Sequence, residues 1–284
     1  MNPWGEAWPA PAKLNLFLHV TGRRADGYHS LQTAFRLIDF ADTLRFTPRG
    51  DGKVTLLRPL AGVPPEQDLC VRAAALLKRT TGHQGGVDIE LEKRIPMGGG
   101  LGGGSSDAAT TLVVLNYLWR LGLRRAKLQQ LALELGADVP VFVFGENAFA
   151  EGVGEELSPL ALPAAWYLVL VPPVAIPTKA VFAAPELTRR TKPIKMCAFF
   201  DGLKQRALRN DLQAVVSSRY PEVAHHLAWL GQHAEARMSG SGACVFAEFS
   251  TEFAARAVHA QLPQAMRGFV ARGLERHPLH GLTE

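Results

Sequence analysis

The segment at residues 96–107 constrains this chain more than any other, because six of the seven residues from 98 to 104 are glycine. The segment reads Pro-Met-Gly-Gly-Gly-Leu-Gly-Gly-Gly-Ser-Ser-Asp. Glycine permits positive φ and lets backbone amides approach a ligand closely. A helix that begins near Ser105 or Ser106 would direct its unpaired N–H groups at an anion. The segment therefore predicts a phosphate-binding loop, with a polyphosphate as its natural ligand.

Better-known phosphate loops do not fit this segment. Gly98, Gly100 and Gly103 satisfy the G-x-G-x-x-G pattern of dinucleotide-binding proteins. However, the preceding strand alternates acidic and aliphatic residues, and no acid lies between Asp107 and Glu134, where a ribose-binding acid is expected. The Walker A ending Gly-Lys-Ser/Thr and the His-Arg-Asp loop of protein kinases are also absent from the sequence. A flexible linker is disfavoured because two capping hydroxyls and a helical pattern follow.

The hydropathy pattern predicts an α+β chain. Lys13 and Asn15 share the face opposite the leucines of the first strand, and a polar turn centred on Asp26-Gly27 follows it. A domain boundary is expected near 155–165, where the composition becomes rich in Pro and Ala. We expect strands at 12–20, 43–46, 54–57, 87–92, 166–171, 243–246 and 269–272, an apolar segment at 31–40, and helices at 69–79, 106–121, 126–135, 211–218, 221–233 and 251–262.

Composition limits the class of protein and its surroundings. The chain has 284 residues, 47% of them hydrophobic, and no apolar run approaches the roughly 20 residues of a membrane span. It also lacks a secretory signal pattern, so we expect a cytoplasmic protein that does not cross a membrane. Cys70, Cys197 and Cys244 are scattered, which argues against disulfides or a zinc site. The net charge is +5, but basic and acidic residues are interspersed, so no nucleic-acid partner is expected.

Three segments, taken together, resemble the three ordered motifs of the GHMP kinase superfamily. They are Pro-Ala-Lys-Leu-Asn-Leu at 11–16, the glycine loop with its helix at 96–109, and Ser-Gly-Ser-Gly-Ala at 239–243. The six-glycine loop and the segments at 24–29, 136–140 and 150–155 closely resemble the branch that acts on diphosphocytidyl-methylerythritol. This resemblance implies an ATP-dependent kinase that phosphorylates the substrate's 2-hydroxyl in the non-mevalonate route to isoprenoid precursors.

The resemblance also implies the domain organisation and the ligands. It implies an α+β GHMP kinase fold with a ribosomal-S5-like, ATP-binding domain at 1–157 and a ferredoxin-like domain at 158–284, with the active site in the cleft between them. The ligands would be a small cytidylyl substrate and ATP with Mg²⁺. The Ser106 hydroxyl is one candidate ligand for the ion, and the role of Asp107 beside it is open, so the metal ligands stay unassigned. We expect a monomer or a weak homodimer.

The roles of individual residues follow from the same resemblance. Asp138 would be the catalytic base, and Lys13 its partner, which would favour the ionised carboxylate and offset charge on the transferred phosphoryl group. Taken alone, Lys13 would be a surface lysine and Asp138 a turn aspartate. The residues expected to bind the cytidine end are Asn15, Tyr28, His29 and Phe182. The residues expected to bind ATP are Pro96, Met97, Gly98, Gly99, Gly100, Leu101, Gly102, Gly103, Gly104, Ser105 and Ser106.

Other functions remain open at this point. One is another GHMP kinase that acts on mevalonate, homoserine or a sugar. A second is a non-catalytic module that binds RNA or a nucleotide, which the basic pI and the glycine loop would suit. A third is a dinucleotide-dependent oxidoreductase.

Overall fold

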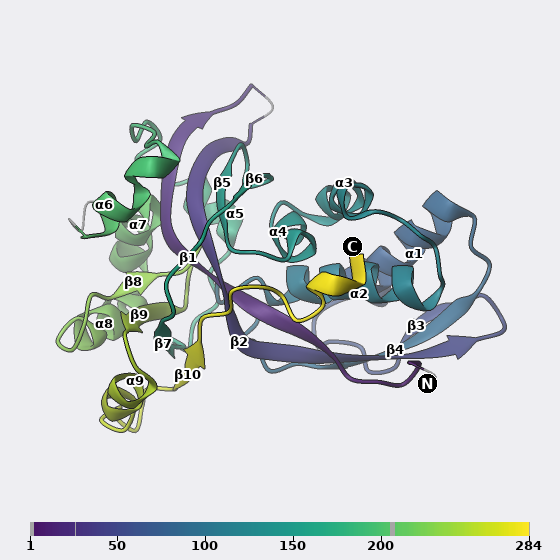
Figure 1. The fold of residues 1–284 in the computed structure, drawn as a ribbon. Coiled ribbons are helices and arrows are strands. Elements are labelled where there is room, and N and C mark those ends of the chain that lie inside the picture. Colours follow the sequence, from purple (N-terminus) through teal and green to yellow (C-terminus); the bar gives the residue numbers. More distant parts are fainter. Residues whose placement is uncertain (1–2, 26, 205–207, 284) are drawn as a thin grey trace.

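A computed structural model describes residues 3–25, 27–204 and 208–283. The chain forms two parts that lie side by side, each with its own sheet and its own helices (Figure 1). Asp26, at the centre of the predicted turn, lies outside the described residues. The mixture of sheets and helices confirms the predicted α+β class.

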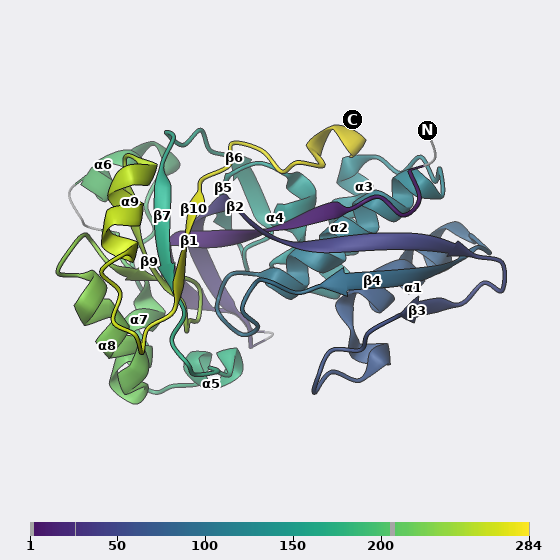
Figure 2. The ribbon, with the colours of Figure 1, turned by 90° about the horizontal axis from the view of Figure 1, so that it is seen from below.

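The first part is a six-stranded sheet covered on one face by helices. Its strands follow the order β3-β4-β2-β5-β6, with β1 paired to β2. The strands are β1 (Trp8–Arg23), β2 (His29–Arg49), β3 (Val54–Leu56), β4 (Gly86–Glu92), β5 (Ala148–Glu151) and β6 (Glu156–Pro159). The helices are α1 (Leu69–Thr81), α2 (Gly103–Leu118), α3 (Arg125–Leu135) and α4 (Val139–Phe144), with the short 3-10 turn η1 (Pro65–Gln67) before α1. Seen from below, α2 lies behind the strands of this sheet (Figure 2).

The second part is a four-stranded antiparallel sheet in the order β10-β7-β9-β8. Its strands are β7 (Trp166–Leu170), β8 (Arg237–Met238), β9 (Val245–Phe249) and β10 (Gly268–Arg272). Its helices are α5 (Thr178–Phe182), α6 (Phe199–Lys204), α7 (Asp211–Arg219), α8 (Pro221–Leu230) and α9 (Glu252–His259), and η2 (Met196–Ala198) precedes α6. None of the helices in the described ranges is long and apolar enough to cross a membrane.

The long β1–β2 pair connects the two parts. β1 contributes Ala10 to the core under α1 and α2, Leu14 to the core at the junction, and Leu18 to the core of the second part. Because both of its faces are covered, Lys13 and Asn15 are only 2% and 3% exposed. The interpretation of Lys13 as a surface lysine is therefore wrong, and its ammonium group is held inside the molecule.

Several predicted boundaries need correction. The segments at 31–40 and 43–46 belong to one strand, β2, because its pairing with β1 continues through both. α2 begins at Gly103, three residues before the predicted start, and ends at Leu118 because Arg120 takes a positive φ of 53°. α8 and α9 end three residues early, and β9 begins at Val245 rather than 243. The short elements β5, β6, α4, α5 and α6 were not expected.

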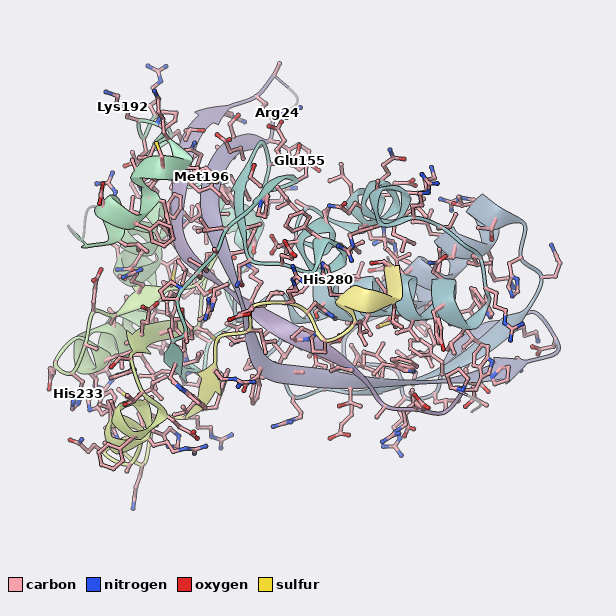
Figure 3. All side chains as sticks on the ribbon, viewed as in Figure 1. Arg24, Glu155, Lys192, Met196, His233 and His280 are labelled. Atoms are coloured by element: carbon pink, nitrogen blue, oxygen red, sulfur yellow. The ribbon has the colours of Figure 1, made fainter. Side chains whose placement is uncertain are left out.

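The C-terminal tail returns to the first part of the molecule. After β10, Leu274 donates its N–H to the Leu37 carbonyl at 2.8 Å, and η3 (His280–Thr283) packs against α2. The Arg125 guanidinium at the start of α3 donates to the His280 carbonyl at 2.7 Å. In Figure 3, the labelled His280 lies on this terminal turn. A division into domains at 157/158 stays a prediction, and the tail adds a C-terminal segment to the N-terminal core.

His277 makes this tail sensitive to acid. It is 5% exposed, and burial, assisted by His280, lowers the pKa of His277 to about 3. Its Nδ1 accepts the N–H of Leu279 at 3.1 Å. In the unfolded chain this histidine has an ordinary pKa near 6.5. Between about pH 3 and pH 6.5, the unfolded chain therefore binds a proton that the folded chain does not bind. The stability from this residue is therefore complete above about pH 6.5 and is lost as the pH falls toward 3.

We expect the free energy of unfolding to be about 2 kcal/mol lower at pH 5 than at pH 8 because of this histidine. His277→Gln, which keeps an acceptor for Leu279, should remove that part of the pH dependence in urea unfolding. His233→Gln is the matched control, because His233 is an exposed histidine in the turn after α8 (Figure 3). Identical pH dependence in wild type and His277→Gln would contradict the assignment.

Candidate active site

A cavity of about 1300 Å³ lies where the two parts meet. Its walls come from segments far apart in the sequence: the middle and end of β1, the first part of β2, the segment before α1, the glycine loop, the junction before α4, α5, and the turn after β8. In Figure 2, α5 lies on the side of the molecule where the two parts face one another. Most of the residues that the sequence analysis singles out lie on these walls.

The glycine loop is pressed against the second part of the molecule. Gly100 has φ +75°, and a Cβ on it would lie 2.1 Å from the Ser239 carbonyl oxygen. The Ser239 hydroxyl donates to the Gly100 carbonyl at 2.9 Å and accepts the Asn15 N–H at 3.2 Å. The Ser-Gly-Ser-Gly turn therefore supports the loop from one side, and glycines of both segments line the cavity.

Replacing Gly100 should damage the loop far more than replacing Gly98. Both have positive φ, but a Cβ on Gly98, at φ +68°, meets nothing within 4 Å. Gly98→Ala should therefore cost about 1 kcal/mol of backbone strain, whereas Gly100→Ala adds a collision with backbone. We expect Gly100→Ala to lower the free energy of unfolding by roughly 3 kcal/mol or more and to weaken ADP binding. Denaturant unfolding and ADP titration check this, and equal effects of the two variants would contradict it.

The first turn of α2 faces the cavity. Gly102 caps the helix in the left-handed region, and Gly103, Gly104 and Ser105 follow on the cavity wall. The first N–H groups of a helix have no partner within it, and the helix dipole makes this end attractive to anions. The chain thus offers a set of amide donors to a phosphate-sized anion.

A buried lysine lies beside an accessible carboxylate on the cavity wall. Lys13 Nζ lies 3.3 Å from Asp138 Oδ2, and the side chain of Asp138 is 43% exposed. The Lys13 ammonium also donates to Asn15 Oδ1 at 2.5 Å and lies 5.3 Å from the centre of the Phe35 ring. The Asn15 amide donates to Thr33 Oγ1 at 2.9 Å. Lys13 is therefore fixed from several sides, while Asp138 remains reachable by a ligand.

Another part of the cavity wall carries aromatic groups. The His29 ring, from the start of β2, stacks on the Phe182 ring of α5 with centroids 5.1 Å apart. Tyr28 lies beside them on the cavity wall and is 64% exposed. Partial burial and the nearby cations Arg189 and Arg23 lower the pKa of His29. Flat rings with a neutral imidazole suit a heteroaromatic base.

A charged cluster lies beneath the glycine loop. Lys93 Nζ donates to Asp107 Oδ2 at 2.7 Å and also contacts Asp42 Oδ2. Asp42 in turn accepts the N–H groups of Arg94 and Ile95 at 2.5 and 2.8 Å. Burial raises the pKa of Asp107, and the neighbouring Asp42 adds to the effect. The cluster fixes the chain at the entry to the loop and couples it to the first turn of α2.

Two expected loop residues do not reach the cavity. Leu101 is 1% exposed and packs in the core at the junction. Ser106 is fully buried, and its hydroxyl donates to the Pro11 carbonyl at 2.7 Å. Asn15 lies on the wall beside Lys13 rather than with the aromatic groups. The other expected residues line the cavity: Lys13, Tyr28, His29, Pro96, Met97, Gly98, Gly99, Gly100, Gly102, Gly103, Gly104, Ser105, Asp138 and Phe182.

Sequence reasoning missed some cavity residues. Arg189, Lys93 and Thr178 lie on the wall but belong to no recognisable motif. Thr33 was missed as well; its register partner on β1 is Leu18, and its hydroxyl accepts the Asn15 amide at 2.9 Å.

Comparison with known families agrees with this architecture. Residues 68–146 match the family of GHMP kinases N terminal domains, and residues 198–268 match the family of GHMP kinases C terminal domains. A solved mevalonate kinase covers 95% of the chain with a TM-score of 0.70 at 14% identity, which shows a shared fold. The fold and both matched domains define a small-molecule kinase of the GHMP class.

More similar proteins narrow this class. The 4-diphosphocytidyl-2-C-methyl-D-erythritol kinase of Nitrosospira multiformis is 64% identical over 279 residues, which cover 97% of this chain and 94% of that protein. The crystal structure of a 4-(cytidine 5'-diphospho)-2C-methyl-D-erythritol kinase has a TM-score of 0.82 at 36% identity, covering 94% of this chain and 99% of that one. The chain belongs to the family of 4-diphosphocytidyl-2-C-methyl-D-erythritol kinases.

Proposed function

We propose that the protein transfers the γ-phosphoryl group of ATP to the 2-hydroxyl of 4-diphosphocytidyl-2-C-methyl-D-erythritol. The observation that carries this proposal is one cavity lined by a helix N-terminus, a Lys13–Asp138 pair and a stacked aromatic wall. The family of the chain supports the same substrate. The three features would bind the phosphates, the reacting hydroxyl and the cytosine respectively.

Asp138 acts as the base. An alcohol is a poor nucleophile until its proton is accepted, and a positioned carboxylate contributes typically 100- to 10,000-fold. The half-exposed carboxylate of Asp138 accepts the proton of the substrate hydroxyl as the new P–O bond forms and the bond to ADP breaks. Lys13, 3.3 Å away, holds that carboxylate in place and offsets negative charge on the transferred group.

The glycine loop holds the phosphates of ATP. The N–H groups of the loop and of the first turn of α2 supply the hydrogen-bond donors. The hydrogen bond from Ser239 to the Gly100 carbonyl keeps the loop in position. Leu101 and Ser106 support the loop from the interior.

The residues on the cavity wall fit a magnesium ion that arrives with ATP. Mg²⁺ usually keeps several waters and binds one or two protein oxygens plus phosphates. Within the described ranges, no three His, Cys, Asp or Glu side chains gather to hold a metal on their own. The Ser105 hydroxyl and the Asp138 carboxylate are oxygen donors on the wall. The ion would neutralise phosphate charge there when it is bound.

The aromatic wall holds the cytidine end. Tyr28 and Phe182 offer faces on which a pyrimidine can stack, and His29 offers a ring nitrogen for a hydrogen bond. Asn15 positions Lys13 through its carbonyl oxygen. The cytoplasmic location and the monomeric or weakly dimeric state stay predictions from the sequence.

Release of ADP from MgATP tests the proposal. The purified protein is incubated with the cytidylyl substrate, mevalonate, homoserine or galactose in parallel. Release with the cytidylyl substrate alone is expected. Release with another alcohol would overturn the substrate, and no release with any of them would favour a non-catalytic nucleotide- or RNA-binding module.

A further inference from the structure

Arg189 connects the two segments that carry His29 and Phe182. It lies in the segment after α5, on the cavity wall, and its guanidinium makes four hydrogen bonds. Nη2 donates to the carbonyls of Phe182 and Ala184 at 3.0 and 2.5 Å, and Nη1 donates to the Leu187 carbonyl at 3.2 Å. Nε donates to Nε2 of His29 at 3.3 Å. One side chain thus links the loop that carries Phe182 to a histidine 160 positions away.

The bond to His29 determines where the imidazole carries its proton. Arginine stays protonated in proteins and has donors only. Nε2 of His29 must therefore be the bare, accepting nitrogen, so in the neutral ring the proton sits on Nδ1. A free histidine has no such constraint. Arg189 leaves His29 with one available polar atom, an N–H donor.

The charges around His29 keep it neutral. Arg189 approaches from the segment after α5, and Arg23 approaches from β1, where it is the register partner of His29. The Phe182 ring covers one face. Both cations oppose a second proton on the ring, in addition to the effect of partial burial.

We propose that Arg189 is a positioning residue that fixes His29 as a hydrogen-bond donor through Nδ1, and that this donor discriminates cytosine from uracil. This inference rests on the proposed cytidylyl substrate. The pairing edge of cytosine has an accepting ring nitrogen, N3, beside an accepting carbonyl, whereas uracil carries an N–H donor at N3. A fixed N–H donor complements the first edge and opposes the second, because two donors cannot pair.

Nitrogen NMR of the histidine rings tests the assignment without any turnover. The His29 signals are identified in ¹⁵N-histidine-labelled protein by their loss in His29→Gln. We expect a protonated Nδ1 and a bare Nε2 in the wild type. Arg189→Met should allow the Nε2–H form and raise the pKa of His29, since a nearby cation is removed. An unchanged ring state in Arg189→Met would overturn the proposal.

Binding of cytidine and uridine monophosphates tests the consequence. Arg189→Met should weaken CMP binding roughly tenfold and reduce the preference for CMP over UMP, while ADP affinity stays unchanged. Arg189→Lys keeps a cation but has a methylene group where Nε stands, so it should hold the His29 pKa down yet lose the fixed tautomer. Arg190→Met, at the exposed neighbouring arginine, is the matched control.

The outcomes separate this proposal from the proposed function. An unchanged CMP preference in Arg189→Met, or an equal loss of CMP and UMP binding with the ring state intact, would mean that Arg189 only braces the loop and would overturn the inference. A wild-type protein that shows the fixed tautomer and the CMP preference but releases no ADP would overturn the kinase activity and leave the role of Arg189 standing.

Discussion

Asp138→Asn should lower kcat by roughly 100- to 10,000-fold while leaving ADP affinity close to that of the wild type. The substitution keeps the size of the side chain and removes the group that accepts the proton. The amides of the glycine loop do not depend on Asp138, so nucleotide binding should survive. Rapid-quench measurement of phosphoryl transfer and calorimetric titration with ADP check the two halves of this expectation.

The matched control for this variant is Asp51→Asn. Asp51 pairs with Arg49 at 2.6 Å in an exposed pair at the end of β2, far along the sheet from the cavity. Loss of this ion pair in Asp51→Asn should change kcat by less than about twofold. Near-normal turnover in a folded Asp138→Asn protein would remove Asp138 from the role of base.

Lys13→Met should lower kcat by roughly 100- to 1,000-fold, the usual cost of removing one preorganised donor from developing charge. Met has a similar length and is apolar, so it can fill the space beside Phe35 that the lysine stem occupies. Removing one partner of an ion pair is costly mainly when the other charge stays buried, and the Asp138 side chain is 43% exposed, so water can solvate its carboxylate. We therefore expect a melting temperature within a few degrees of the wild type. The lower kcat would then reflect a slower phosphoryl transfer and not unfolding of the protein.

Lys53→Met, at an exposed lysine, controls for the change in net charge. It should leave kcat and the melting temperature unchanged. If Lys13→Met also lost its melting transition, the stability of the pair would be its main contribution. If it kept both fold and full turnover, the buried ammonium would have no part in phosphoryl transfer.

Local signals in the sequence predicted much of the framework. α1 runs from a residue capped by Asp68, which accepts the N–H groups of Cys70 and Val71, to the left-handed Gly82. Such starts and stops depend on a few neighbouring residues, so α1 and α3 appear within two residues of their expected bounds. The phosphate loop could likewise be predicted, because the glycines that it requires are adjacent in the chain.

The details of that loop could not be predicted from spacing. Because α2 starts at Gly103 rather than at Ser106, the Ser106 side chain falls on the buried face of the helix and bonds to Pro11. Whether a run of glycines becomes loop or helix depends on what it packs against. Here a Cβ on Gly103 would lie 3.0 Å from Ile95. The first turn of α2 therefore packs closely on the segment before the loop, and this packing helps to determine where the helix begins.

Contacts between distant segments needed the tertiary structure. Lys13 and Asp138 are far apart in sequence, and only the resemblance to known kinases placed them together before the fold was described. Arg189 has no motif, since three of its partners are backbone carbonyls and the fourth is His29. Residues that act through backbone partners leave no pattern of side chains in the sequence.

The most direct test of the central claim is the position of the phosphate in the product. After incubation of the protein with MgATP and 4-diphosphocytidyl-2-C-methyl-D-erythritol, ³¹P NMR should show one new phosphomonoester beside the two diphosphate signals, and its correlation spectrum should connect it to the 2-carbon of the methylerythritol. In the same sample with Asp138→Asn, this signal should grow at least about 100-fold more slowly. A phosphomonoester at another carbon, or ADP formed with inorganic phosphate as the only other product, would contradict the account.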